Sequence, residues 1–478
     1  MANKSNFIDL CRGDFGRKIA YTGIEQITSD NVAKVVSDTI GTHNRNRTMI
    51  DYLYMYYKGD QPILYREKLV RPEVNNKVSE NHALETVKFK AGQIYGEPIQ
   101  YVCKKKNTNA ETNEQVDLLN DYLDEANADA RNIQLGIYQS AIGTAYKAIL
   151  REDDWTEDSD MPPFRIFIPY PGDCYIVYSR KNGKAMLSVQ VLKDENEEQY
   201  YLCYSKNQFY EIQNGKVKRV GINGFGGIPI IEYPNNHDRL SDIEIAITLF
   251  DAINKYQSDR LNGVEQFVQA FMKFKNCEID ENEFLKMVKL GAISVKDTGS
   301  GCQSDVELMT AELNQSESQV AKDDIYNNML IVEAMPNRQS NTGGDTGNAV
   351  YLRNGWDFAE RDAKLVEAFT KEAEKASVRI ILNIIRKTTK DIKISTRDFD
   401  VKITRNPTDN MLVKAQALDY LVKNKIHPLI ALITCGLFSD PQKVYEMSFP
   451  YMQSLYENPE EEVQKAQALL SGKDVKEE

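Results

Sequence analysis

The residues whose side chains most often carry out chemistry are widely separated in this chain. Its four histidines lack the HxxxH or HExxH spacing that places two metal ligands on one helix face, so we expect surface or packing roles for them; they are His43, His82, His237 and His427. The seven cysteines never occur as CxxC, which predicts reduced thiols in a cytosolic compartment rather than disulfides or a zinc site. No GxSxG motif and no Cys–His spacing indicates a nucleophile with its base.

Two glycine-rich stretches lack the context that a phosphate site requires. GINGFGGIP, residues 221–229, precedes a strand-like segment, whereas a dinucleotide loop must open directly into a helix. NTGGDTGNA, residues 341–349, opens a helix but lacks the GK[ST] that grips phosphates. The first stretch is therefore interpreted as a β-turn, and neither predicts a cofactor site.

An acidic cluster surrounds Trp155 in a segment typical of a hairpin tip; its carboxylates are Asp153, Asp154, Glu157, Asp158 and Asp160. Their spacing fits no calcium loop, so a solvated tip is the favoured interpretation and a cation site is the alternative. We predict no catalytic residue, no metal site and no cofactor, and do not expect an enzyme.

Charge and hydropathy narrow the class of protein further. The net charge of −12 argues against a protein that grips nucleic acid by its phosphates, because such binding needs a basic surface. The first residues lack the apolar core of a signal peptide, and no stretch reaches the roughly 18 apolar residues of a membrane span. We therefore expect neither a secretion signal nor a membrane partner.

The first half of the chain predicts an α+β domain. Residues 1–58 are expected to be mostly helical, with Thr28-Ser29-Asp30 as a helix cap and a tyrosine-rich run that ends at Gly59 and packs in the core. Helices continue over 79–150, beginning with one capped by Ser79 that stops at Gly96-Glu97-Pro98. Short aromatic and β-branched segments over 149–234 predict antiparallel strands joined by tight turns.

The second half alternates long helices with short segments. Apolar residues at steps of three and four predict helices over 241–272, 315–335 and 350–387. A small mixed module of 273–311 lies between the first two, and the polar, glycine-rich stretch 336–349 precedes the third and is expected to be mobile. A strand pair (DIKISTRDF, VKITRN), a helical portion from Asp409 and an acidic tail complete the chain.

Negative charge is concentrated in the helix–module–helix segment. Residues 241–335 contain 17 Asp and Glu and 8 Lys and Arg, a net of −9 out of the chain's −12. Two helices that leave a domain and return would carry the module at their far end, as a stalk carries a cap.

Six short motifs occur in one order along the chain. They are Tyr56-Tyr57-Lys58-Gly59 before Pro62-Ile63-Leu64; Asn75-Asn76-Lys77-Val78; Gly96-Glu97-Pro98-Ile99; Ile228 to Tyr233 before Asn235-Asn236 and Ser241-Asp242; Asp251, Asn254, Ser258 and Asp259; and Pro336-Asn337 before Gly347-Asn348-Ala349. In this order the chain resembles the portal proteins of tailed bacteriophages with long non-contractile tails and Gram-positive hosts, the SPP1-like portal family. Thr346 departs from a commoner Ser before Gly347, and residues beyond 406 match loosely.

The resemblance implies a mainly helical α+β portal fold, assembled as a dodecameric ring with wing, stem, clip and crown. By resemblance, 1–240 is wing, 241–272 and 313–335 are stem helices, 273–312 is clip and 336–349 is the tunnel loop. Residues 350–405 return to the wing, and 406–478 form the crown and acidic tail. The ring would sit at the capsid portal vertex of the virion, after assembly in the host cytoplasm, and pass double-stranded DNA without sequence specificity during packaging and ejection.

The same resemblance implies the partners and the residues that meet them. Terminase and the head–tail adaptor would dock on the clip, here Glu278, Asp280, Glu281, Glu283, Lys286, Lys289, Lys296 and Asp297. The tunnel loop would face DNA through Asn337, Arg338, Gln339, Ser340, Asn341, Thr342, Gly343, Gly344, Asp345, Thr346, Gly347 and Asn348. Major capsid and scaffolding proteins are further expected partners.

Two other functions compete with a portal. Another ring-forming head–tail connector or adaptor is the structural alternative, although such proteins are usually much shorter than 478 residues. A packaging nuclease or ATPase is the enzymatic alternative, and it would need a Walker-type loop or a carboxylate cluster for two metals.

Overall fold

The protein is described by a computed structural model that covers most of the chain. The described residues are 7–11, 14–69, 72–104, 110–152, 154–156, 161–268, 271–275, 280, 282, 285, 305–309, 315–337, 354–389, 391–405, 411–438 and 441–456. They form two compact units: residues 1–92, 134–148 and 167–373 make up the first, and 93–133, 149–166 and 374–478 the second. Helix predominates over strand in the described residues, which confirms the predicted α+β, mainly helical class.

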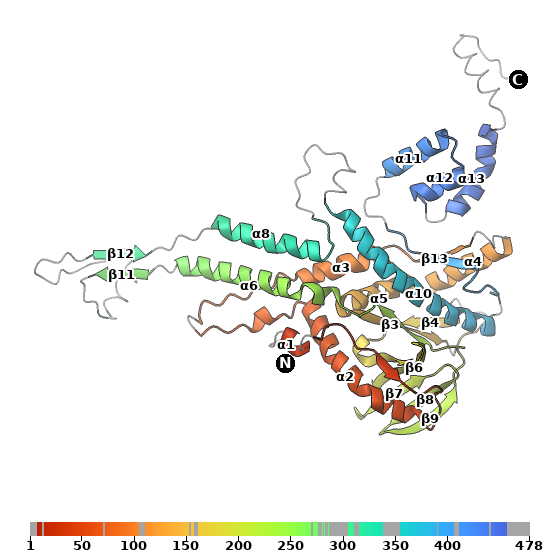
Figure 1. The fold of residues 1–478 in the computed structure, drawn as a ribbon, viewed down its shortest axis with the longest axis horizontal. Helices are drawn as coiled ribbons and strands as arrows, with labels where there is room; N and C mark the ends of the chain where they lie inside the picture. The colour runs from red at the N-terminus through yellow and green to blue at the C-terminus, as the bar shows by residue number, and fades with distance from the viewer. Residues whose placement is uncertain are drawn as a thin grey trace, which may run out of the picture. The chain divides into compact units, whose positions relative to one another are not determined.

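A six-stranded sheet lies at one end of the first unit (Figure 1). Its order is β1 (Ala20–Thr22), β5 (Cys174–Ser179), β6 (Ala185–Lys193), β7 (Gln199–Tyr204), β8 (Gln208–Gln213) and β9 (Lys216–Ile222). β1 is parallel to β5 and the other neighbours are antiparallel. The predicted strands and hairpins are therefore confirmed, and Asn214 and Gly215 take the positive φ angles that a tight hairpin needs.

Helix α2 (Val32–Tyr57) packs on this sheet at its start and on other helices at its end. Val32, Val35 and Val36 join the apolar core of the sheet. Tyr52 and Tyr56 are fully buried in a second core, which confirms that the tyrosine-rich run is a packing surface. The short helix α1 (Phe7–Cys11), β1 and η2 (Pro62–Tyr65) flank α2, so the N-terminal region is less uniformly helical than predicted.

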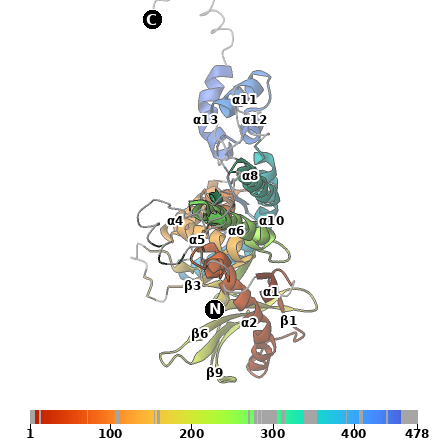
Figure 2. The ribbon, with the colours of Figure 1, turned by 90° about the vertical axis from the view of Figure 1, so that its left-hand side faces the viewer.

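Two long helices leave the second core side by side. They are α6 (Asp242–Val268) and α8 (Gln315–Val332), and Figures 1 and 2 show them adjacent from two directions. β11 (Phe271–Lys275) pairs antiparallel with β12 (Asp305–Met309) at their far end. The first helix ends four residues before the predicted Met272, because the chain there enters β11.

Shorter elements link the sheet to the helices. α3 (His82–Tyr95) ends just before Gly96, as predicted, and α5 (Ala128–Ile142) leads into β3 (Thr144–Arg151). The prediction that helices extend to residue 150 is therefore wrong, because the chain after Ile142 pairs with β10 as a strand. β10 (Ile230–Pro234) pairs antiparallel with β3 in a three-stranded sheet of order β10-β3-β4, where β4 is Phe164–Phe167. η3 (Pro171–Asp173) precedes β5.

The third predicted long helix is α10 (Trp356–Thr388), which belongs to both units. In the second unit, β13 (Phe399–Lys402) pairs antiparallel with β2 (Gln100–Cys103), beside α4 (Ala110–Glu125). The predicted pairing of DIKISTRDF with VKITRN is wrong, because residues 391–398 form no strand and the single short strand pairs with β2 instead. The predicted helical C-terminal portion is confirmed as α11 (Met411–Lys423), α12 (Pro428–Cys435) and α13 (Pro441–Tyr456).

Both predicted helix caps are replaced by nearby asparagines. Asn31, not Thr28-Ser29-Asp30, precedes α2, and its side chain accepts a hydrogen bond from the Thr28 N–H. Asn81 caps α3 by accepting the Leu84 N–H, while Ser79 donates to Gln61. Within the described part of the chain, no helix combines the length and apolar character needed to cross a membrane.

Candidate functional site

The predicted tunnel loop is described only at its margins. Asn337 is its one described site residue, and Arg338 to Asn348 lie outside the described residues. The Asn337 N–H donates to the Asn354 carbonyl at 2.9 Å, and its side chain donates to Asn327 at 2.9 Å. The two ends of the segment 338–353 are therefore joined at its base and tied to α8.

The predicted clip residues fall mostly outside the described part of the chain. Asp280 is exposed, and its carboxylate accepts the N–H of Asn282. Structure is not described for Glu278, Glu281, Glu283, Lys286, Lys289, Lys296 or Asp297. What the structure does place is the strand pair β11–β12, which brackets this module at the end of α6.

The most regular polar feature is a ladder between α6 and the extended segment 74–81, here called the strap. The backbone N–H groups of Asn76, Val78 and Glu80 donate to side chains of α6 at 2.7, 3.0 and 2.8 Å. The acceptors are Asn262 Oδ1, Ser258 Oγ and Asn254 Oδ1, respectively, and all three side chains belong to buried residues.

Helix and strand geometry explain why this ladder is in register. Four residues of helix rise about 6 Å, so Asn254, Ser258 and Asn262 form a row on one face. Two residues of extended chain cover about 6.6 Å, which nearly matches that spacing. Alternate N–H groups of the strap therefore meet successive polar side chains of α6, with the two segments running in opposite directions.

The ladder gives a physical role to two of the sequence motifs. Asp251 accepts a hydrogen bond from the buried Tyr56 hydroxyl at 2.8 Å, and Asp259 forms an ion pair with Arg66. Together with Asn254 and Ser258, they hold the strap and the end of α2 to α6. Sequence reasoning missed Asn262, although three polar residues four apart in an otherwise apolar helical pattern could have revealed it.

Gln61 links the strap, α2 and α6 from a fully buried position. Its amide nitrogen donates to Asn81 Oδ1 at 3.0 Å and to the Tyr56 carbonyl at 3.3 Å. Its amide oxygen accepts from the Ser79 hydroxyl and from the Asn254 amide. All four hydrogen-bonding positions of this amide are thus used, so its burial leaves no polar atom unsatisfied.

A charged cluster attaches α8 to the end of the strap. His82 contacts carboxylates of Glu80 and Glu85 at 3.1 and 3.0 Å, and Lys322 of α8 pairs with Glu80 at 2.6 Å. The Tyr326 ring packs against His82. Burial alone would lower the pKa of His82, but its hydrogen bonds to the two carboxylates raise that pKa to about 9. His82 is therefore a cation at neutral pH.

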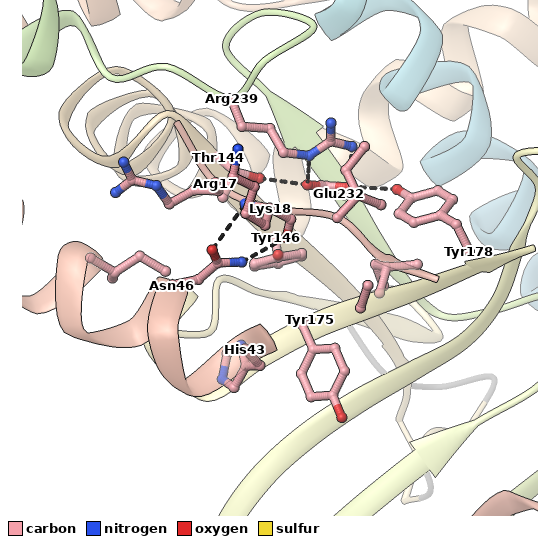
Figure 3. A pocket seen from close by; sticks show the side chains of 14 residues that line it. Arg17, Lys18, His43, Asn46, Thr144, Tyr146, Tyr175, Tyr178, Glu232 and Arg239 are labelled. Carbon is pink, nitrogen blue, oxygen red and sulfur yellow. Dashed lines mark hydrogen bonds and ion pairs between the residues drawn. The ribbon is translucent and has the colours of Figure 1, made fainter. Parts of the chain in front are cut away.

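Another charged cluster lies beside a small cavity of about 20 Å³ (Figure 3). Glu232 of β10 accepts two hydrogen bonds from Arg239, at 2.6 and 2.9 Å, and others from Thr144 and Tyr178. Burial opposes ionisation of Glu232, but Arg239 and these hydrogen bonds lower its pKa. The cavity has room for about one water molecule, and the cluster fixes the turn that leads into α6.

The other histidines have separate structural roles. His43 is buried, hydrogen-bonds the Gly172 carbonyl at 2.9 Å and stacks on Tyr175, and burial lowers its pKa to about 4. His237 is exposed beside Asp238, and His427 caps α12 by accepting the Leu429 N–H. Among the described residues, no group of three or more His, Cys, Asp or Glu side chains could hold a metal ion.

The remaining motifs are turns rather than ligand sites where they are described. In the 221–229 stretch, Asn223 donates to the carbonyls of Ser205 and Gly227, and the chain continues into β10, which confirms the predicted β-turn. Trp155 donates to the Met161 carbonyl at 2.7 Å. Of the carboxylates around it, Asp154 is described and exposed, while Asp153, Glu157, Asp158 and Asp160 lie outside the described residues.

Comparison with known proteins gives one family. A family model described as "Phage portal protein, SPP1 Gp6-like" matches residues 37–468, about nine-tenths of the chain. No curated protein matches the chain. The matched range includes the strap, α6, α8 and α10.

Proposed function

We infer the role of this chain from its family, because it belongs to the SPP1 Gp6-like phage portal proteins. Family membership makes it a portal protein of the capsid vertex, used for packaging DNA. We propose that it acts there as one subunit of a dodecameric ring and not as an enzyme, and that the same ring serves DNA ejection. The family match carries this proposal, and the features below support it.

The paired helices α6 and α8 are the proposed stem. They lie side by side, and their charged and polar contacts with the strap fix them to the body of the first unit. The strand pair β11–β12 stands at their far end and forms the base of the module 273–312 that we propose as the clip. We propose that residues 1–240 and 350–405 form the wing, and 406–478 the crown and tail.

Exposed apolar side chains on α8 and α10 favour contacts between subunits. Val320, Ile331, Phe358 and Leu365 are each more than 60% exposed in the single chain. Single exposed apolar residues are common, but several on adjoining helices mark a surface that another protein covers. In a ring, the neighbouring subunits would cover them.

Charge supports a channel through which DNA slides without sticking. Residues 241–335 carry a net of −9 by composition, so twelve copies would carry on the order of −100 around the channel. Such a field repels the phosphate backbone instead of binding it. Double-stranded DNA would then pass without sequence-specific contacts.

The proposed moving part is the tunnel loop, 336–349, which contains no large apolar side chain. Its composition of Gly, Asn, Thr and Ser allows little burial to hold it in one conformation. The hydrogen bond from Asn337 to Asn354 would anchor the base of the loop while its tip follows the DNA.

We propose that the module 273–312 docks the terminase during packaging and the head–tail adaptor afterwards. Major capsid and scaffolding proteins are the proposed partners at the capsid vertex, and assembly is proposed to occur in the host cytoplasm. The family match favours the portal over the alternative of a head–tail connector or adaptor.

The mass of the purified full-length protein in solution tests the ring directly. Native mass spectrometry or analytical ultracentrifugation should find an assembly of about twelve subunits, from a chain of 54.6 kDa. A stable monomer with nuclease or ATPase activity would contradict the proposal.

A further inference from the structure

Four helices bring charged groups together where α6 begins and α8 ends. Lys90 comes from α3, Asp242 is the first residue of α6, Glu333 directly follows α8, and Asp362 lies on α10. Asp242 and Glu333 are 6% and 2% exposed, whereas the side chains of Lys90 and Asp362 are 12% and 36% exposed. The carboxyl groups of Asp242 and Glu333 are therefore held away from bulk water.

Among the described residues, two of these carboxyl groups have hydrogen-bonding or ion-pair partners. Lys90 Nζ lies 2.5 Å from Asp362 Oδ2, and Asp242 accepts hydrogen bonds from Ser140 and Asn235. Both carboxyl oxygens of Glu333 are buried and have no hydrogen-bond partner within the part of the chain that the structure describes. If all three carboxyl groups were ionised, the cluster would carry a net charge of −2, because Lys90 supplies a single positive charge.

The helix ends decide which carboxyl group should be neutral. Burial raises the pKa of Asp242, but Asp242 lies at the N-terminus of α6, where the helix dipole favours a negative charge, and its hydrogen bonds from Ser140 and Asn235 favour that charge too. Glu333 lies at the C-terminus of α8, where the dipole disfavours one. A buried, unpaired carboxylate is also costly, and a carboxyl group in that position usually takes a proton instead.

We propose that Glu333 binds a proton in the packed protein and that this proton latches the end of α8 against α3, α6 and α10. Burial first, and then the charges of Asp242 and Asp362, raise the pKa of Glu333, while Lys90 opposes the shift. Within the described part of the chain, these three are the charged groups whose fields shift the pKa of Glu333.

The latch lies at the junction with the predicted tunnel loop. After Glu333 the chain turns through Ala334, which has a φ of 49°, and the Met335 N–H returns to the Leu330 carbonyl at 2.8 Å. Two residues later Asn337 joins Asn354. Loss of the proton would leave an anion between Asp242 and Asp362, so the end of α8 would open more often toward water. An effect of this proton on DNA passage would rest on the proposed function, whereas the protonation of Glu333 does not depend on it.

Hydrogen exchange of the full-length protein tests the latch. Glu333→Gln keeps a neutral side chain of the same size at every pH, and the control Asp324→Asn removes an exposed carboxylate from the same helix. Exchange of peptides covering 329–337 is compared between variants at each pH from 5 to 9, so intrinsic rates cancel. Relative to Glu333→Gln, the opening constant of the wild type should rise up to tenfold per pH unit above about 4.5, until the pKa of Glu333 is reached.

The controls separate this idea from its competitors. Asp324→Asn should follow the wild type at every pH. The proposal would be overturned if the ratio of the wild-type opening constant to that of Glu333→Gln did not change with pH. So would stabilisation of the wild type, but not of Glu333→Gln, by Mg²⁺ or K⁺, because a cation would then neutralise the site. If Glu333→Gln fails to fold, Glu333→Met replaces it as the neutral reference. The mass of the assembled ring, measured separately, tests the proposed function and does not depend on the protonation of Glu333.

Discussion

The Asn262 side chain accepts the backbone N–H of Asn76 at 2.7 Å across 186 positions of sequence. Its neighbours Ser258 and Asn254 do the same for Val78 and Glu80. Because these acceptors are side chains of one helix, the strap is attached to α6 along a little more than two turns without forming a sheet. These hydrogen bonds thereby fix the start of the proposed stem to the body of the subunit.

Removing the middle contact of this ladder should destabilise the protein. Ser258→Ala leaves the partly buried Val78 N–H without the acceptor that the buried Ser258 supplies, which costs about 1–3 kcal/mol. Urea unfolding measures the loss. Asn328→Ala, an exposed amide on α8, should change the free energy of unfolding by less than about 0.5 kcal/mol. Equal effects of the two variants would refute the role of the ladder.

The cluster around His82 should make stability depend on alkaline pH. Because the pKa of His82 in the folded protein is about 9, above the usual 6.5, its contribution is fully present below pH 6.5. It is lost as the pH rises through about 9, and it is on the order of 3 kcal/mol. The free energy of unfolding of wild type minus His82→Gln, measured from pH 6 to 10, should fall over that window.

An exposed histidine provides the control for that measurement. His237→Gln, which replaces an exposed imidazole outside the His82 cluster, is measured in parallel as that control. If the wild type and His82→Gln keep a constant difference up to pH 10, His82 does not carry the charge that links Glu80 and Glu85.

Gly143 should not tolerate any side chain. It has a φ of 90°, and an added Cβ would lie 2.1 Å from the Arg239 carbonyl oxygen, which is backbone and cannot move alone. Gly143→Ala should therefore lower the free energy of unfolding by several kcal/mol, or prevent folding. Gly41→Ala, in α2 with no atom near its added Cβ, should instead stabilise by up to about 1 kcal/mol. Thermal unfolding of both variants checks the contrast.

The exposed apolar residues of α10 should matter for assembly and not for the fold of one subunit. Leu365→Glu puts a charge where a neighbouring subunit would bury an apolar side chain, so rings should dissociate at protein concentrations at which the wild type stays assembled. Native mass spectrometry measures the distribution, with circular dichroism to verify folding. Asn196→Glu, which adds the same charge to an exposed turn, should assemble normally.

Arg338 is the only cation of the predicted tunnel loop and is proposed to touch phosphates transiently. Arg338→Ala should therefore reduce DNA retention or packaging in an assay with assembled capsids, and Arg338→Lys should retain more of both. Unchanged packaging and retention in Arg338→Ala would show that the loop guides DNA without this charge.

The sequence by itself determined the order of elements and the family. Apolar periodicity predicted the ends of α6, α8 and α10 to within six residues, because a helix that buries one face must repeat at that spacing. The strands of 149–234 followed from short aromatic and β-branched segments and from turn residues, as at Asn214-Gly215. These patterns depend on neighbouring residues alone, so they can be recognised without knowing how the rest of the chain folds.

Tertiary structure alone decided the choices between locally equivalent residues and the distant pairings. Several polar residues precede α2 and α3. In the folded protein Asn31 occupies the N-cap position of α2, and the Asn81 side chain caps α3, in place of the predicted Thr28-Ser29-Asp30 and Ser79. β13 pairs with β2, which is distant in sequence, because the residues just before β13 form no strand. Glu333 is an ordinary glutamate by sequence; its environment exists only once α3, α6, α8 and α10 meet, since burial and the charges of other helices set its proton affinity.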